Sequence, residues 1–166
     1  MKSITKIGSS LRSSKSNKIL IKIIQNMDLI KEHNEKYRFF ADITGEAMRV
    51  YNKYHPGLIE SAYEAALAYL LTQSGHKVER QVDLYMYWDD VRLDQKYRLD
   101  LVVDGVICEL KAVTYVDAAH RKQLWNYMNL THTEYGMLIN FGNEDRLFSE
   151  WYQRYPDGAI EKIRMM

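Results

Sequence analysis

The chain has 166 residues, of which 46% are hydrophobic and 27% charged, and its formal net charge of +1 and apolar content suit one globular domain with a buried core. A single cysteine, Cys108, excludes an intramolecular disulfide and cannot form a structural zinc site alone, which favours a reducing, cytoplasmic setting. No apolar run approaches the roughly 20 residues that a membrane-spanning helix needs, so we expect no membrane association.

The start of the chain differs in charge from the rest. Residues 1–27 contain six Lys or Arg and no acid, whereas the remaining residues carry 17 basic and 22 acidic side chains. Because residues 1–35 are basic, Ser-rich at the start and without a sustained apolar period, we expect a flexible or loosely packed extension. The folded domain is placed at residues 36–166. Its mildly acidic charge argues against a broad basic face for nucleic acid but allows a local basic groove.

Two helices are predicted first. From about Lys36, apolar residues recur every three or four positions until the His-Pro-Gly break at residues 55–57. A second run of good helix formers follows and ends at Gly75, a residue suited to a left-handed helix cap.

Strands and one more helix are predicted next. Residues 117–131 return to helical spacing, and residues 134–142 indicate a further buried strand. A last edge strand is expected within residues 159–166, after a Tyr-Pro-Asp-Gly turn. The β-prone segments before the helix lie around residues 78–84, 85–88, 97–103 and 106–113. An antiparallel hairpin, a crossover helix and another strand predict an α/β (α+β) fold with a mixed sheet flanked by helices.

The hairpin at residues 98–112, RLDLVVDGVICELKA, carries charges in an apolar setting. Its Asp-Gly turn fixes the pairing, and counting outward opposes Asp100 to Glu109 and Arg98 to Lys111. A hard divalent cation would relieve the repulsion between opposed carboxylates and take their oxygens as ligands. Such an ion can polarise a phosphoryl oxygen and generate hydroxide, with a lysine to offset negative charge. The alternative is a solvated face of surface ion pairs, which the charge pattern alone favours.

Several short motifs give the chain a family resemblance. The D-x(8)-E-x-K spacing of the hairpin resembles the signature of the PD-(D/E)XK nuclease-like superfamily. GLIESAY, with Gly57, Glu60 and Tyr63, resembles the defining motif of the GxxExxY protein family, and YRLD, ELKA, HRKQ and INFG follow in that family's order. The resemblance covers about residues 40–142. One departure is Leu99, which stands where the superfamily's name-giving proline would be.

The resemblance implies a restriction-endonuclease-like αβββαβ core, Mg²⁺ or Mn²⁺ as cofactor, and nucleic acid as partner, with DNA favoured over RNA. A homodimer is compatible with it. It assigns metal ligation to Asp100, Glu109 and Glu60, and catalytic roles to Lys111, Glu60 and Gln123. From position alone, Glu60 could simply stabilise the start of its helix, where a carboxylate interacts well with the helix dipole. For Gln123, an exposed polar position is an equal alternative.

Three more residues are candidates for substrate contact, each with an ordinary structural alternative. Arg98 could bind a phosphate or pair with Glu109. Tyr63 is more often a packing aromatic whose hydroxyl group finds one partner. His120 shares a helical stripe with Gln123 and could be an exposed polar residue.

The function expected from this pattern is a divalent-metal-dependent nuclease that hydrolyses phosphodiester bonds in nucleic acid. The alternative is a nucleic-acid-binding or protein-interaction module that keeps the nuclease fold without turnover, which the acidic charge of the domain slightly favours. The aromatic strand DLYMYWDD at residues 83–90 would suit base stacking. Alternating Tyr and Trp residues, however, usually pack within a sheet.

Overall fold

The structure, a computed structural model, describes residues 15–164. Side chains are described from Lys31 onward, with the exception of His33. No helix within the described range is long and apolar enough to cross a membrane.

The chain divides into two compact units, Met1–Phe40 and Ala41–Met166. The described part of the first unit is helical. It belongs to helix α1 (Lys15–Tyr54), which continues into the second unit. This helix begins well before the start predicted near Lys36. Its sequence holds no proline and a single glycine, so helix propagation meets no strong breaker. That residues 1–35 form a flexible or loosely packed extension stays a prediction, and residues 1–14 of it lie outside the described residues.

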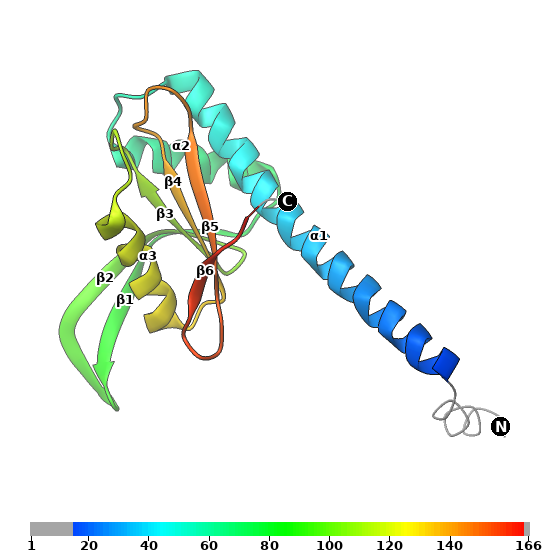
Figure 1. The fold of residues 1–166 in the computed structure, drawn as a ribbon. Coiled ribbons are helices and arrows are strands. Elements are labelled where there is room, and N and C mark those ends of the chain that lie inside the picture. The colour runs from blue at the N-terminus through cyan, green and yellow to red at the C-terminus, as the bar shows by residue number, and fades with distance from the viewer. Residues whose placement is uncertain (1–14, 165–166) are drawn as a thin grey trace, which may run out of the picture. The chain divides into compact units, whose positions relative to one another are not determined.

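Apart from β5, the second unit follows the predicted order of elements (Figure 1). The strands of the described chain form one six-stranded sheet in the order β1-β2-β3-β4-β5-β6, with β3 and β4 parallel and the other neighbours antiparallel. The predicted mixed sheet flanked by helices is therefore confirmed, and the run from α2 to β4 has the αβββαβ order. After α1 the elements are α2 (Glu60–Gln73), β1 (Val78–Trp88), β2 (Val91–Val103), β3 (Val106–Lys111), α3 (Ala118–Thr131), β4 (Tyr135–Asn140), β5 (Phe148–Arg154) and β6 (Ile160–Lys162).

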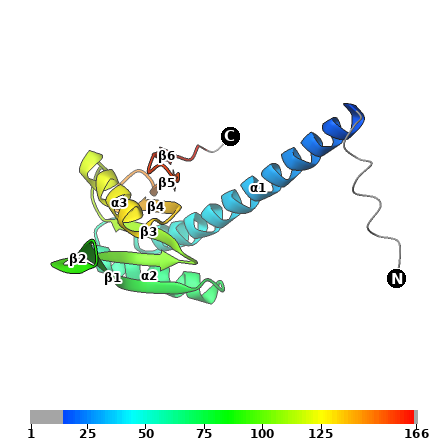
Figure 2. The ribbon, with the colours of Figure 1, turned by 90° about the horizontal axis from the view of Figure 1, so that it is seen from below.

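Helices cover both faces of the sheet, with α3 on one face and α2 on the other (Figure 2). Under α3, Leu124 and Met128 pack against Ile107 and Leu138, and all four side chains are buried. Burial of one such side chain contributes roughly 1.5–3 kcal/mol to folding. Gly136 makes room for this contact, because a Cβ atom there would lie 2.6 Å from the sulfur of Met128.

The turn between β2 and β3 has the geometry that its sequence predicts. Asp104 and Gly105 have φ angles of 47° and 85°, the left-handed pair of a tight two-residue hairpin turn. The predicted register is confirmed for the three residue pairs next to the turn, the last of which is Leu101 with Cys108.

The predicted opposition of Asp100 and Glu109 is wrong, because the pairing of β2 with β3 ends one residue earlier, at Leu101 and Cys108. Asp100 Oδ2 accepts a hydrogen bond from the Leu110 N–H group at 2.8 Å, so a side chain replaces a main-chain partner. On its other edge, β3 stays paired with β4, with Glu109 opposite Leu138. We call the place where the pairing of β2 with β3 ends, at Asp100 and Glu109, the fork.

The last part of the chain contains one strand that was predicted and one that was not. The expected edge strand is confirmed as β6, after a turn in which Gly158 has a φ angle of 86°. Strand β5 was not predicted, because its buried stretch includes a charged residue, Glu150, beside Trp151 and Tyr152, and the alternation of polar and apolar residues is lost.

Candidate active site

Four of the predicted residues lie in one electrostatic neighbourhood at the fork between β2 and β3. Asp100 is on β2, while Glu109 and Lys111 are two residues apart on β3 and so share one face of the strand. Glu60 is the first residue of α2. Helix α2 contacts both β2 and β3. The negative charge of Glu60 adds to the raised pKa values of Asp100, Glu109 and Lys111.

Glu109 is the most constrained residue of the site. Its Oε1 atom accepts a hydrogen bond from Lys111 Nζ at 2.6 Å, while its Oε2 atom is buried and has no hydrogen-bond partner among the described residues. Burial, assisted by the charge of Asp100, raises the pKa of Glu109 to about 7, although Lys111 acts in the opposite direction. A buried carboxylate with one bare oxygen is costly for the fold. A cation at that oxygen would relieve the cost.

Asp100 is half-buried, and its pKa is also raised. Burial raises its pKa to about 6, the hydrogen bond from Leu110 N–H opposes this rise, and the charge of Glu60 adds to it. Near neutral pH, Asp100 and Glu109 therefore both hold their protons more strongly than ordinary carboxyl groups. Two acids in this condition are a common mark of a functional site.

Lys111 is a buried ammonium group. Burial by itself would lower its pKa, but the charge of Glu109 and the hydrogen bond to it outweigh burial, and the pKa of Lys111 is raised. Its side chain is only 9% exposed. Lys111 is therefore protonated at neutral pH, which suits it to donate hydrogen bonds to an anion rather than to accept a proton.

Glu64, one helical turn after Glu60, was not predicted as part of this site. It is 3% exposed and accepts hydrogen bonds from Arg80 Nε at 2.8 Å and from the Gln81 side chain. Its charge adds to the rise in the pKa of Asp100. The spacing of four residues from Glu60, which places both acids on one helix face, was the signal that could have found it.

Tyr63 lies in the core rather than at an open surface. Its hydroxyl group donates a hydrogen bond to His55 O at 2.6 Å and accepts one from Leu58 N–H at 3.0 Å. Its ring stacks on Phe141 with a centroid distance of 4.7 Å. These contacts support a packing role, in which Tyr63 holds the loop before α2 and thereby the position of Glu60.

The predicted residues of α3 take two different positions. Gln123 Nε2 donates to the Tyr127 hydroxyl group at 3.0 Å. Burial raises the pKa of Tyr127, and the charge of Glu109 adds to the rise, so Gln123 approaches the site through Tyr127. His120 caps the start of α3, since its main-chain N–H donates to Asp117 Oδ1 at 3.0 Å and its Nδ1 accepts from Asp117 N–H at 3.1 Å.

Arg98 does not face Lys111, because the pairing of β2 with β3 ends before it. Its strand partner is Asp83 of β1, and its Nε atom lies 3.3 Å from Asp83 Oδ1. The Arg98 side chain is 55% exposed, so a contact with substrate stays a prediction.

The donor set for a metal ion is incomplete in the structure. Within the part of the chain that is described, no group of three or more His, Cys, Asp and Glu side chains is arranged to hold a metal ion. Asp100 and Glu109 provide the carboxylate oxygens that hard divalent cations prefer, and one of these oxygens is bare and buried. The two residues therefore fit such an ion, whereas ligation by Glu60 stays a prediction.

Comparison with known proteins gives one family. A model described as the PD-(D/E)XK nuclease superfamily matches residues 37–154. No curated protein matches the chain. Among solved structures, the crystal structure of SSO0001 has 19% sequence identity and a TM-score of 0.41, and the match covers 75% of this chain and 65% of that one. The chain thus spans less than two thirds of the length of that structure. Membership of the narrower GxxExxY family stays a prediction.

Proposed function

Because the chain belongs to the PD-(D/E)XK nuclease superfamily, we propose that it is an enzyme that hydrolyses phosphodiester bonds of nucleic acid with a divalent metal ion, Mg²⁺ or Mn²⁺. The observation that carries the proposal is the bare, buried Oε2 atom of Glu109 beside the ammonium group of Lys111. A bound divalent ion supplies Lewis-acid chemistry, since it polarises a phosphoryl oxygen and lowers the pKa of bound water.

The residues of the fork have distinct proposed roles. Asp100 and Glu109 hold the ion, and Glu60 adds a third carboxylate directly or through water. Lys111 donates hydrogen bonds to the phosphate or to the attacking water and offsets the negative charge that develops during hydrolysis. Gln123 orients groups at the site through the Tyr127 hydroxyl group.

Proton binding at the site competes with metal binding. The raised pKa values of Glu109 and Asp100 mean that both groups carry protons over part of the range below pH 7. A metal ion needs them ionised, so we propose that metal affinity and cleavage both increase as the pH rises through this range.

The proposal is tested by incubating the purified protein with labelled DNA and RNA, single- and double-stranded, in Mg²⁺, Mn²⁺ or EDTA. We expect cleavage that requires the metal and that falls by at least about 100-fold in Lys111→Ala and in Glu109→Gln. The first variant removes the group that offsets negative charge in the transition state, and the second removes a carboxylate that holds the ion. We also expect Mn²⁺ to raise the Tm of the wild type but not that of Glu109→Gln.

The exposed pair Lys77 and Glu79 offers a matched control, because its Nζ and Oε1 atoms lie 3.2 Å apart at the surface. Lys77→Ala and Glu79→Gln should cleave like the wild type. Absence of metal-dependent cleavage by the wild type, or equal rates for Lys111→Ala and the wild type, would contradict the proposal. Salt-sensitive binding without cleavage would instead support the non-catalytic binding module.

A further inference from the structure

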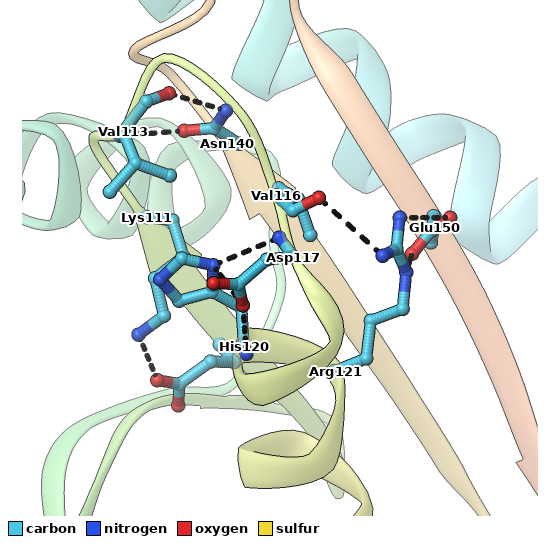
Figure 3. Close-up of polar contacts among 9 residues, drawn as sticks. Lys111, Val113, Val116, Asp117, His120, Arg121, Asn140 and Glu150 are labelled. Atoms are coloured by element: carbon cyan, nitrogen blue, oxygen red, sulfur yellow. Dashed lines mark hydrogen bonds and ion pairs between the residues drawn. The ribbon is translucent and has the colours of Figure 1, made fainter.

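The loop between β3 and α3, residues 112–117, is tied to the end of β4 and to the chain just after it. Asn140, which is 1% exposed, accepts a hydrogen bond from Val113 N–H at 3.0 Å and donates one to Val113 O at 2.7 Å (Figure 3). Asn143 donates to Thr114 O at 3.2 Å. Two side chains therefore fix the main chain on the β3 side of this loop.

The other side of the loop is fixed by α3. Arg121 Nη1 donates to Val116 O at 3.5 Å, and Asp117 N–H donates to His120 Nδ1 at 3.1 Å (Figure 3). Connecting loops are usually the more mobile parts of a domain. This one has its main chain held immediately before and immediately after Tyr115.

Tyr115 is the residue that this fixed loop exposes. Its side chain is 76% exposed, more than any other large apolar side chain in the described part of the molecule. A rigid aromatic side chain on a held backbone loses little conformational entropy when a partner binds. Tyr115 follows Lys111 by four residues, so the two Cα atoms are at most about 14 Å apart. One bound oligonucleotide can therefore reach both residues.

We propose that Tyr115 stacks on an unpaired base of the nucleic acid whose phosphate lies at Lys111. The inference rests on the proposed function, for which it names a substrate contact. Every base has an aromatic face, so this contact gives affinity and position without reading a particular base. It also implies that the preferred substrate is single-stranded or locally unpaired beside the cleaved bond.

The test measures binding of a labelled single-stranded oligonucleotide in EDTA, where metal-dependent cleavage is prevented. Tyr115→Ala should weaken binding by about 5- to 100-fold, the range expected for loss of one stacked base, and Tyr115→Trp should retain it. A series of oligonucleotides with one missing base then locates the contact. At one position the missing base should weaken binding to the wild type and have no further effect on Tyr115→Ala.

Tyr69→Ala is the matched control, because Tyr69 is 64% exposed on α2, and this variant should bind like the wild type. Unchanged Tm values for both variants would show that the fold is intact. Wild-type affinity of Tyr115→Ala, or a loss that is the same at every missing-base position, overturns the inference while leaving hydrolysis to stand on its own assay. If binding depends on Tyr115 but no substrate is cleaved, the hydrolytic proposal is overturned and the stacking contact stands. Failure to bind any oligonucleotide overturns both.

Discussion

Two buried glutamates of the sheet, Glu109 and Glu150, have opposite electrostatic conditions. Glu150 is 5% exposed, and its carboxylate accepts hydrogen bonds from Arg121, Tyr152 and Lys162. Burial acts to raise the pKa of Glu150, but these hydrogen bonds outweigh it and the pKa is lowered. Glu109 has one ammonium partner and one bare oxygen, and its pKa is raised. A fully satisfied buried charge indicates a structural role, whereas a partly satisfied one indicates a site.

The first prediction at this scale concerns stability against pH without metal. Because the pKa of Glu109 rises from an ordinary value of 4.5 to about 7 on folding, its stabilising contribution is complete below the ordinary value and is lost as the pH rises through the raised one. This corresponds to a loss on the order of 3 kcal/mol. Urea unfolding in EDTA between about pH 5 and pH 8 should therefore show a steeper decline for the wild type than for Glu109→Gln.

Glu150→Gln is the control for that measurement. Its lowered pKa stabilises the fold above the ordinary value and ceases to do so only as the pH falls, so the slope between about pH 5 and pH 8 should match the wild type. The free energy of unfolding should nevertheless drop by about 1.5–3 kcal/mol, since charged hydrogen bonds are lost. If the free energy of unfolding declined with pH equally steeply in the wild type and in Glu109→Gln, the pKa of Glu109 would not be raised by folding.

At the scale of elements, the site depends on where the pairing of β2 with β3 ends and on the contacts that fix the loop between β3 and α3. The pairing of β2 with β3 ends just before Asp100, and the loop after β3 lies against Gly142. A Cβ atom at Gly142 would lie 2.4 Å from Val113 N and 2.5 Å from Ala112 C, closer than real Cβ contacts allow. The absence of a side chain at this one position lets the loop dock.

Gly142→Ala should therefore displace the loop and lower both stability and substrate affinity. We expect a loss of about 1–3 kcal/mol in the free energy of unfolding, the usual cost of a steric insertion, together with a higher KM. Gly45→Ala is the matched control, because its new Cβ atom would meet nothing within 4 Å on helix α1 and should stabilise the protein by about 0.5–1 kcal/mol. Similar behaviour of the two variants would count against a docked loop.

At the scale of the whole molecule, the site residues all belong to the second compact unit. That unit is Ala41–Met166, and the family match begins at residue 37. We propose that residues 1–35 form an extension and that a protein beginning at Lys36 keeps the fold and the activity. Such a truncated protein should match the full chain in metal-dependent cleavage and in the cooperativity of thermal unfolding. Loss of activity together with intact folding would instead assign residues 1–35 a part in substrate binding.

What the sequence by itself determined was the set of local features. The Asp-Gly turn determines the register of the hairpin as far as Leu101 and Cys108, because a two-residue loop allows only one way of pairing the residues that flank it. The spacing of two residues puts Glu109 and Lys111 on the same face of β3. The order of helices and strands, apart from β5, also follows from the residue pattern along the chain.

Only the tertiary structure decided how these local features combine. At the fork, the pairing of β2 with β3 ends at Leu101 and Cys108, and the Asp100 side chain accepts a hydrogen bond from the main-chain N–H group of Leu110. The bare oxygen of Glu109, the burial of Glu64 and the held backbone around Tyr115 depend on neighbours from other elements. Turns and periodicity are set by adjacent residues, whereas burial and hydrogen-bond satisfaction are set by residues that only folding brings together.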